Sequence, residues 1–315
     1  MTSVIYRPYR GLFPESATIL AACWKVVLAA TLLFLVACSR NAVPGSLDSK
    51  EPAMPHSANP ARIVFLHHST GGIIWRGGLP QFIQSWNSAH GTNHEITELA
   101  YPSATGGHLR LRKFLPARIF NKVVSDRYPW DNQPYDYWNL WVAHTGENRD
   151  RSEMNLDDLA RSYDVIVFKH CFPVSQVQPD DGSPSVSSPR PTLANYMLQY
   201  AALKLRMHQF PQTRFIVWTG PALTQASTHP DEAARARQFA TWVKRTWDEK
   251  GDNIFVWDFR ELETDGGLFL KPENARDPDN SHPSTALATK VAPLMGRRIV
   301  DVIEGRGDSS SLTGQ

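Results

Sequence analysis

The chain has 315 residues, of which 42% are hydrophobic and 20% are charged. This composition is ordinary for a globular protein, and the length allows a large core without help from disulfides or metals. The formal charge is +2, and residues 1–37 carry three basic residues and one acidic residue, so the remainder is formally neutral. We therefore expect no nucleic-acid partner. Three cysteines also exclude a disulfide framework.

The N-terminus has the pattern of an export signal. Lys25 precedes an uncharged apolar run over residues 26–37. As a helix this run would rise about 18 Å, which is too short for a hydrocarbon core of about 30 Å. We predict that residues 1–37 form a signal peptide. The alternative is an N-terminal membrane anchor that is never cleaved.

The apolar run ends in Leu35-Val36-Ala37-Cys38, which resembles the lipobox of bacterial lipoproteins. The resemblance implies that Cys38 is lipidated after cleavage and anchors the chain to a membrane. Ser39 follows, as in lipoproteins that are sent to the outer membrane, so we expect a location in the cell envelope facing the periplasm. Residues 38–60 are rich in Pro, Ser and Asn and are predicted to form a flexible tether.

Buried strands alternate with helical patterns along the rest of the chain. The predicted strands are 62–66, 95–101, 162–168, 214–218 and 253–257, and the predicted helices are 79–89, 191–209, 230–250 and 283–304. Apolar strands that alternate with helices indicate a parallel sheet covered on both faces. We predict an α/β domain over residues 61–305, with a central five-stranded parallel sheet in a flavodoxin-like three-layer sandwich.

Two segments exceed this minimal pattern. Residues 108–160 are rich in aromatic and charged side chains, and residues 171–190 are rich in Pro and Ser. We predict that both are inserts beside the sheet that border a site at its carboxyl edge. Residues 306–315 are predicted to be a disordered tail.

The first strand runs into His67-His68-Ser69-Thr70-Gly71-Gly72. A serine directly after a strand, followed by glycines, can expose its hydroxyl while nearby backbone N–H groups stay free to hold an oxyanion. An ordinary loop is the alternative interpretation.

A second candidate group lies at Asp279 and His282. If they share a turn before a helix, the carboxylate can bind one imidazole nitrogen while the other faces outward, as serine activation requires. The alternative is an Asx turn and helix cap ahead of Pro283. Both groups follow strands of the predicted sheet, as do Lys169 and His170, so we expect them at one edge.

These blocks resemble the SGNH or GDSL hydrolase superfamily. Residues 279–282 match its Asp-x-x-His block, residues 63–71 occupy the place of its serine block, and residues 217–221 and 253–262 resemble its later strand regions. The resemblance covers roughly residues 62–304. It implies a serine esterase with Ser69 as nucleophile, His282 as base and Asp279 as the acid that orients it.

The chain departs from the family in two blocks. His67-His68 replaces the usual Gly-Asp before the serine, and Lys169-His170-Cys171 stands where Gly-x-Asn-Asp supplies an oxyanion donor. The resemblance then leaves four candidates for the oxyanion and substrate contacts, listed in chain order: Thr70, Gly106, Gly107 and His170. Loss of one donor typically lowers turnover by about 10²–10³.

The combined prediction is an envelope-anchored serine ester hydrolase that removes acyl groups, such as acetyl, from a glycan or small ester and needs no cofactor or metal. The alternative is a non-catalytic lipoprotein of the same fold that binds a glycan or a protein partner. An α/β-hydrolase is disfavoured because its Gly-x-Ser-x-Gly elbow is missing. A metal site is disfavoured because the adjacent His67 and His68 point to opposite faces of a strand. Cys171 is read as a structural thiol rather than a nucleophile.

Overall fold

The computed structural model describes residues 60–103, 131–146 and 153–315, which belong to the compact unit Ala53–Gln315. The predicted signal peptide, Cys38, the tether up to residue 59, Gly106 and Gly107 lie outside the described residues. None of the helices within the described ranges combines the length and apolar character needed to cross a bilayer.

Five parallel strands form the central sheet. They are β1 (Arg62–His67), β2 (Glu95–Ala100), β3 (Val165–Phe168), β4 (Arg214–Trp218) and β5 (Ile254–Trp257), in the spatial order β2-β1-β3-β4-β5. The central strand β3 is buried throughout, whereas the edge strand β2 has no fully buried residue. Every neighbouring pair is parallel, which confirms the predicted α/β class.

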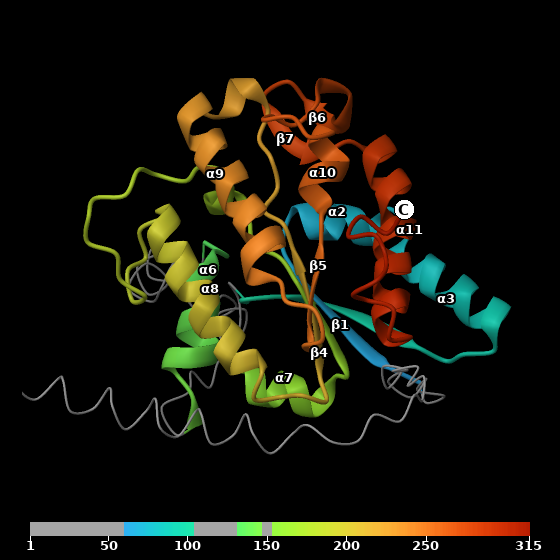
Figure 1. Cartoon of the computed structure of the whole chain (residues 1–315). Helices are drawn as coiled ribbons and strands as arrows, with labels where there is room; N and C mark the ends of the chain where they lie inside the picture. Colours follow the sequence, from blue (N-terminus) through green and yellow to red (C-terminus); the bar gives the residue numbers. More distant parts are fainter. Residues whose placement is uncertain (1–59, 104–130, 147–152) are drawn as a thin grey trace, which may run out of the picture. The chain divides into compact units, whose positions relative to one another are not determined.

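Helices cover both faces of this sheet (Figure 1). One face carries α6 (Pro134–Trp138), α8 (Leu193–Met207) and α9 (Pro230–Trp242), and the other carries α2 (Thr70–Arg76), α3 (Leu79–His90) and α11 (Thr285–Ile303). Alternate residues of β1 feed the two cores: Val64 and Leu66 pack in one cluster, Ile63 and Phe65 in the other. Period-two side-chain direction thus builds the three predicted layers.

Several element boundaries differ from the sequence prediction. The strand predicted from residue 162 begins only at Val165, because Ser162 ends the helix α7 (Leu156–Ser162). The helix predicted over 230–250 is α9 followed by a π-helical turn, Val243–Trp247, and β5 leads into a short helix α10 (Phe259–Thr264). The turn expected before the last helix is a β-hairpin, β6 (Ala275–Asp277) and β7 (Asn280–Pro283).

The structure shows how the described part of the first predicted insert packs, and it corrects the prediction for the C-terminal tail. The described part of 108–160 is folded, with Tyr137 and Trp141 fully buried in the core. The expectation of a disordered tail at 306–315 was wrong. The indole N–H of Trp257 donates to the carbonyl of Thr313 at 3.1 Å, and the backbone N–H of Asp258 donates to the carbonyl of Leu312 at 2.8 Å. The end of the chain is therefore tied to β5 and the residue after it.

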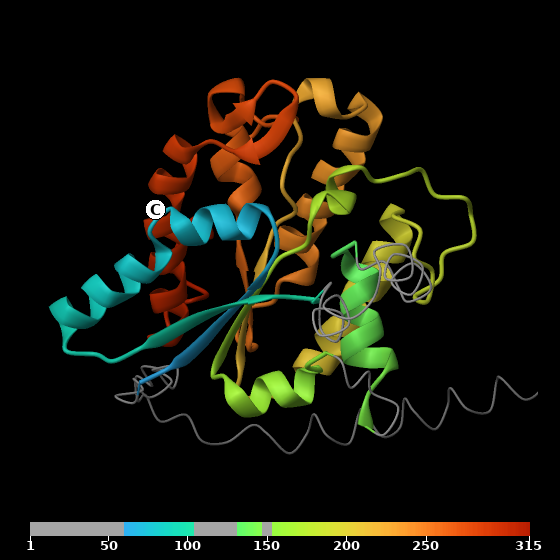
Figure 2. The same ribbon diagram turned by 180° about the vertical axis from the view of Figure 1, so that it is seen from behind.

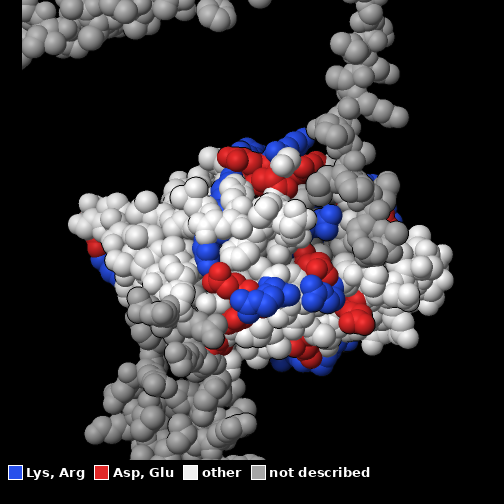
Figure 3. Space-filling view, turned by 90° about the horizontal axis from the view of Figure 1, so that it is seen from below, with Lys and Arg blue, Asp and Glu red and all other residues white. Residues whose placement is uncertain are grey.

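The amino ends of the strands lie at the lower side of the sheet in Figure 1. Seen from this side, basic and acidic side chains lie interspersed rather than gathered by sign (Figure 3). One pair joins neighbouring strands: the Arg62 guanidinium at the start of β1 bonds the Asp164 carboxylate before β3 at 2.9 Å. Because both side chains are more than a third exposed, the pair contributes little to stability.

We predict that Gly296→Ala destabilises the domain. Gly296 lies in α11 against α3, and a Cβ there would stand 2.7 Å from Cγ of Phe82. Overpacking of this kind costs about 1–3 kcal/mol, which outweighs the roughly 0.5–1 kcal/mol that alanine gains over glycine in a helix. Thermal unfolding should show a lower Tm for Gly296→Ala, with part of the loss recovered when Phe82→Leu is added. A raised Tm for the single variant would contradict the tight contact.

Candidate active site

Ser69 lies two residues after the end of β1, at the N-cap position of α2, and its side chain forms no capping hydrogen bond. Its backbone has φ 50° and ψ −106°, and its side chain is exposed. A non-glycine residue at positive φ carries strain of about 1–3 kcal/mol, which persists only where the surroundings fix the backbone. The chain therefore turns sharply at the serine and presents its hydroxyl to solvent.

The carbonyl of His68 is the point at which this turn is held. It accepts the backbone N–H of Gly71 at 3.0 Å and the ammonium of Lys169 at 3.2 Å. The imidazole of His68 in turn donates from Nε2 to the carbonyl of Pro102 at 2.6 Å. Three segments of the chain thus converge on the residue before Ser69.

Lys169 follows β3 and is 1% exposed. Its ammonium lies 3.3 Å from Sγ of Cys171 and forms no ion pair with a carboxylate among the described residues. Burial lowers the pKa of Lys169. Since a buried amine without a carboxylate is costly, its position beneath the Ser69 turn indicates a role in holding that turn.

The β6–β7 hairpin brings the histidine to the serine. In Figures 1 and 2 the hairpin lies above α2, and β7 contacts α2. The buried hydroxyl of Ser281 accepts the backbone N–H of Thr224 at 2.9 Å, which ties β7 to the loop after β4. Neighbouring residues of a strand face opposite ways, so the side chain of His282 lies on the other face of β7 from Ser281 and reaches Ser69.

Ser69 and His282, 213 residues apart, meet in a short hydrogen bond between Oγ and Nε2. The other imidazole nitrogen, Nδ1, lies 2.7 Å from Oδ1 of Asn280. The predicted partner Asp279 is exposed in the turn between β6 and β7 and has no hydrogen bond to His282 in the described structure. The structure therefore brings together two of the three predicted residues and places Asn280 beside them.

The environment of His282 suits a proton acceptor. The half-buried ring packs edge-on against Phe172, with centroids 5.1 Å apart. Burial lowers the pKa of His282, and the positive charges of Arg276 and Lys169 lower it further. The imidazole is therefore neutral near pH 7 and can take a proton from the Ser69 hydroxyl.

The predicted oxyanion contacts have different outcomes. The backbone N–H groups of Ser69 and Thr70 have no acceptor among the described residues, and Thr70 is buried at the start of α2. His170 is fully buried, and its ring packs 4.8 Å from Tyr137 and 5.6 Å from Tyr200. Burial lowers the pKa of His170 to about 3. The structure thus places His170 in the aromatic core and not beside Ser69.

His67 lies at the end of β1, packed against Gly71 in the first turn of α2. Its Nε2 lies 2.8 Å from a carboxylate oxygen of Glu98 on β2, and burial lowers the pKa of His67 to about 3. The neutral ring donates to the carboxylate, which can only accept. His67, the last residue of β1, and His68, which follows the strand, thus have separate partners.

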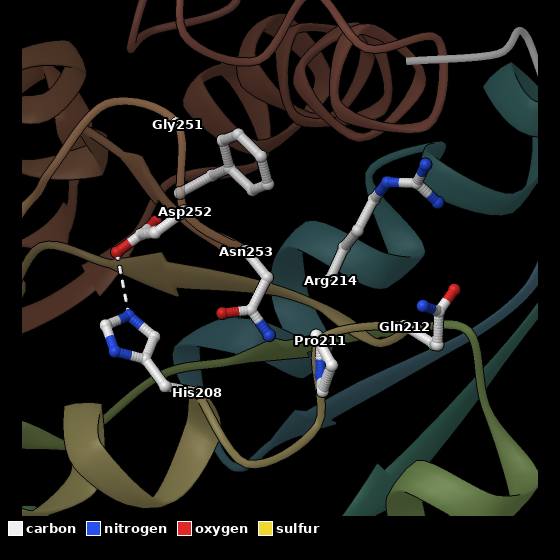
Figure 4. A pocket seen from close by; sticks show the side chains of 8 residues that line it. His208, Pro211, Gln212, Arg214, Gly251, Asp252 and Asn253 are labelled. Carbon is white, nitrogen blue, oxygen red and sulfur yellow. Dashed lines mark hydrogen bonds and ion pairs between the residues drawn. The ribbon is translucent and has the colours of Figure 1, made fainter.

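Several hollows are candidate binding sites, and one of about 290 Å³, lined mostly by charged residues such as Glu261 and Lys271, has no hydroxyl or thiol side chain. One of about 260 Å³ lies beside His282, and its walls include Phe172, Gln176 and Leu223. A larger one of about 400 Å³ lies at the amino edge, where His208 bonds Asp252 at 3.0 Å (Figure 4). The larger hollow has no serine, threonine or cysteine in its lining. We therefore choose the hollow beside His282 as the candidate binding site, because His282 bonds the Ser69 hydroxyl, although this hollow is the smallest of these.

Sequence reasoning missed Asn280, Phe172 and the contact of Lys169 with His68. The first had a usable signal: if residues 280–283 form a strand, positions 280 and 282 share a face. The contacts of Phe172 and Lys169 depend on the packing of distant segments and have no local signal.

No protein-family model and no curated protein matches this sequence. Among solved structures, the chain is similar to the crystal structure of an acetyl xylan esterase, AlAXEase, with 11% sequence identity and a TM-score of 0.38. The match covers 73% of this chain and 96% of the esterase. This likeness is distant, and the fold class rests on the sheet topology itself.

A matched pair of glycine substitutions tests the packing beneath the Ser69 turn. A Cβ at Gly71 would overlap the side chain of His67, with Cγ at 2.7 Å, whereas the nearest atom to a Cβ at Gly72 is the flexible end of Arg76 at 3.3 Å. We expect Gly71→Ala to cost about 1–3 kcal/mol and to lower Tm by roughly 3–10 °C. Gly72→Ala should change Tm by less than about 2 °C. Equal effects in thermal unfolding would show that His67 does not fix the first turn of α2.

Proposed function

We propose that the chain is an ester hydrolase that uses Ser69 as nucleophile and His282 as general base. The observation that carries the proposal is the hydrogen bond between Ser69 Oγ and His282 Nε2. It joins an exposed hydroxyl on a strained turn to a neutral imidazole, and His282 lines a hollow of about 260 Å³. A nucleophile within hydrogen-bond reach of an oriented base is the pattern of covalent serine catalysis.

The chemistry follows from these positions. Ser69 Oγ attacks the ester carbonyl carbon while its proton passes to Nε2 of His282. The carbonyl oxygen becomes an oxyanion beside the backbone N–H groups of Ser69 and Thr70. The C–O bond to the alcohol then breaks, the alcohol takes the proton from Nε2, and an acyl-Ser69 ester remains. A water molecule, deprotonated by His282, attacks that ester and releases the carboxylic acid and the free serine.

The setting of the reaction is also a proposal. Lipidation of Cys38 would hold the domain at the periplasmic side of the outer membrane, on the tether of residues 38–60. Acyl esters of envelope glycans, acetyl esters among them, are reachable from there and have the carbonyl that this site would attack. Gly106 or Gly107 would add a further N–H to the oxyanion, as the resemblance to SGNH hydrolases implies.

Substitution of the two reacting residues tests the proposal. Hydrolysis of p-nitrophenyl acetate by the purified full-length chain in detergent should fall by about 10³-fold or more in Ser69→Ala and in His282→Ala. Circular dichroism should show that both variants stay folded, because Ser69 is exposed and His282 half-buried. Equal rates for the wild type and both variants would refute the proposed mechanism and favour a non-catalytic lipoprotein that binds glycans.

The pH profile provides an independent test. His282 must be neutral to accept the proton, so kcat/KM should rise with pH as this residue deprotonates. Because burial, Arg276 and Lys169 all lower the pKa of His282, we expect the midpoint of the rise below histidine's usual value of about 6.5. Activity measured from pH 4.5 to 8 with one ester checks this. A midpoint above 7 would contradict the electrostatic environment described for His282.

A further inference from the structure

Asn280 determines which nitrogen of His282 carries a proton. Its Oδ1 lies 3.2 Å from the backbone nitrogen of His282 and 2.7 Å from Nδ1 of the same residue. A backbone N–H can only donate, so the amide atom that receives it must be the oxygen. The same oxygen must then accept from Nδ1–H. The proton therefore sits on Nδ1, and the lone pair on Nε2 faces the hydroxyl of Ser69.

We propose that Asn280, and not Asp279, is the positioning residue of His282, so that the site works as Ser69–His282–Asn280. The inference rests on the proposed ester hydrolysis and deepens it. It follows from strand geometry: Asn280 and His282 are two residues apart in β7 and share a face. Asp279 precedes the strand and is exposed in the turn.

The hairpin fixes the amide as firmly as the imidazole. Asn280 pairs with Asp277 across β6 and β7, and the buried Ser281 between Asn280 and His282 is bonded to Thr224. The side chain of Asn280 therefore cannot turn away without breaking its bond to the backbone of His282. Asn280 thus holds the ring because its Oδ1 accepts two hydrogen bonds from His282, one from the backbone N–H and one from Nδ1–H.

A neutral amide in this place has an electrostatic consequence. The charged groups that act on His282 are Arg276 on β6 and Lys169 after β3, and both disfavour the imidazolium. The uncharged Phe172 and Ser69 also contact the ring, and the exposed Asp279 lines the hollow beside His282 without a hydrogen bond to the imidazole. A carboxylate on Nδ1 would offset the two cations, whereas the amide orients the ring without doing so. The arrangement keeps the base neutral down to a lower pH than a carboxylate would.

Nuclear magnetic resonance of the imidazole tests the tautomer without any substrate. The full-length chain carrying Ser69→Ala and ¹⁵N-labelled histidine should show a protonated Nδ1 and a bare Nε2 for His282 at pH 8. Adding Asn280→Leu should remove this preference, and Asp279→Asn should leave it. Asn280→Asp should keep the tautomer and raise the pKa of His282 by about one unit or more, because a carboxylate stabilises the imidazolium.

Kinetics of the Asn280 and Asp279 variants, measured with Ser69 unchanged, test the role of Asn280 in turnover. We expect Asn280→Leu to lower kcat by about 10²-fold with little change in KM, since the ring loses its orientation. Asn280→Asp should keep kcat within about tenfold and move the acidic limb of the pH profile upward. Asp279→Asn should lose less than about threefold.

The outcomes separate this inference from the proposed function. A larger loss of kcat in Asp279→Asn than in Asn280→Leu, or an Nδ1 proton that is lost in Asp279→Asn and kept in Asn280→Leu, would overturn the role of Asn280. If Ser69→Ala leaves hydrolysis intact, the proposed function fails, while the tautomer measurement still decides which residue positions His282. Should Asn280→Leu unfold, the comparison of Asn280→Asp with Asp279→Asn decides instead.

Discussion

The hydrogen bond between Ser69 and His282 requires two segments that are distant in the sequence to meet at one edge of a parallel sheet. Ser69 arrives from β1 on a strained turn, and His282 arrives from a hairpin that is not part of the sheet. All five strands point the same way, so the loops that follow them meet at one edge. The core on both faces fixes β1, and the loop after β4 fixes the hairpin.

Buried ionisable groups support this edge of the sheet, and the loss of hydration on burial shifts their pKa values. Lys169 loses hydration and holds the carbonyl before Ser69. Glu263, in α10, is fully buried with its pKa raised to about 8, and one of its oxygens accepts the backbone N–H of Ala222. Buried ionisable groups of this kind are uncommon unless they position something. Here they position the turn at Ser69 and the loop that anchors Ser281.

The fold was largely predictable because its signals are local. Four of the five strands are short runs of buried apolar residues, and helices such as α8 show clear apolar spacing between them. The hairpin was missed because β6 and β7 have only three and four residues and alternate little in hydrophobicity. The ordered C-terminal tail was missed because its contacts, such as Thr313 with Trp257, depend on tertiary packing and not on its polar sequence.

The candidate site shows how one misassigned element changes a chemical assignment. If residues 277–283 form a turn before a helix, a spacing of three favours the pairing of Asp279 with His282. In a strand, a spacing of two favours Asn280, and this is the contact that the structure contains. The two pairings predict different bases, because a carboxylate stabilises the imidazolium and an amide does not. Together with Arg276 and Lys169, the amide keeps His282 deprotonated down to a lower pH, but it stabilises the imidazolium that forms on proton transfer from Ser69 less than a carboxylate would.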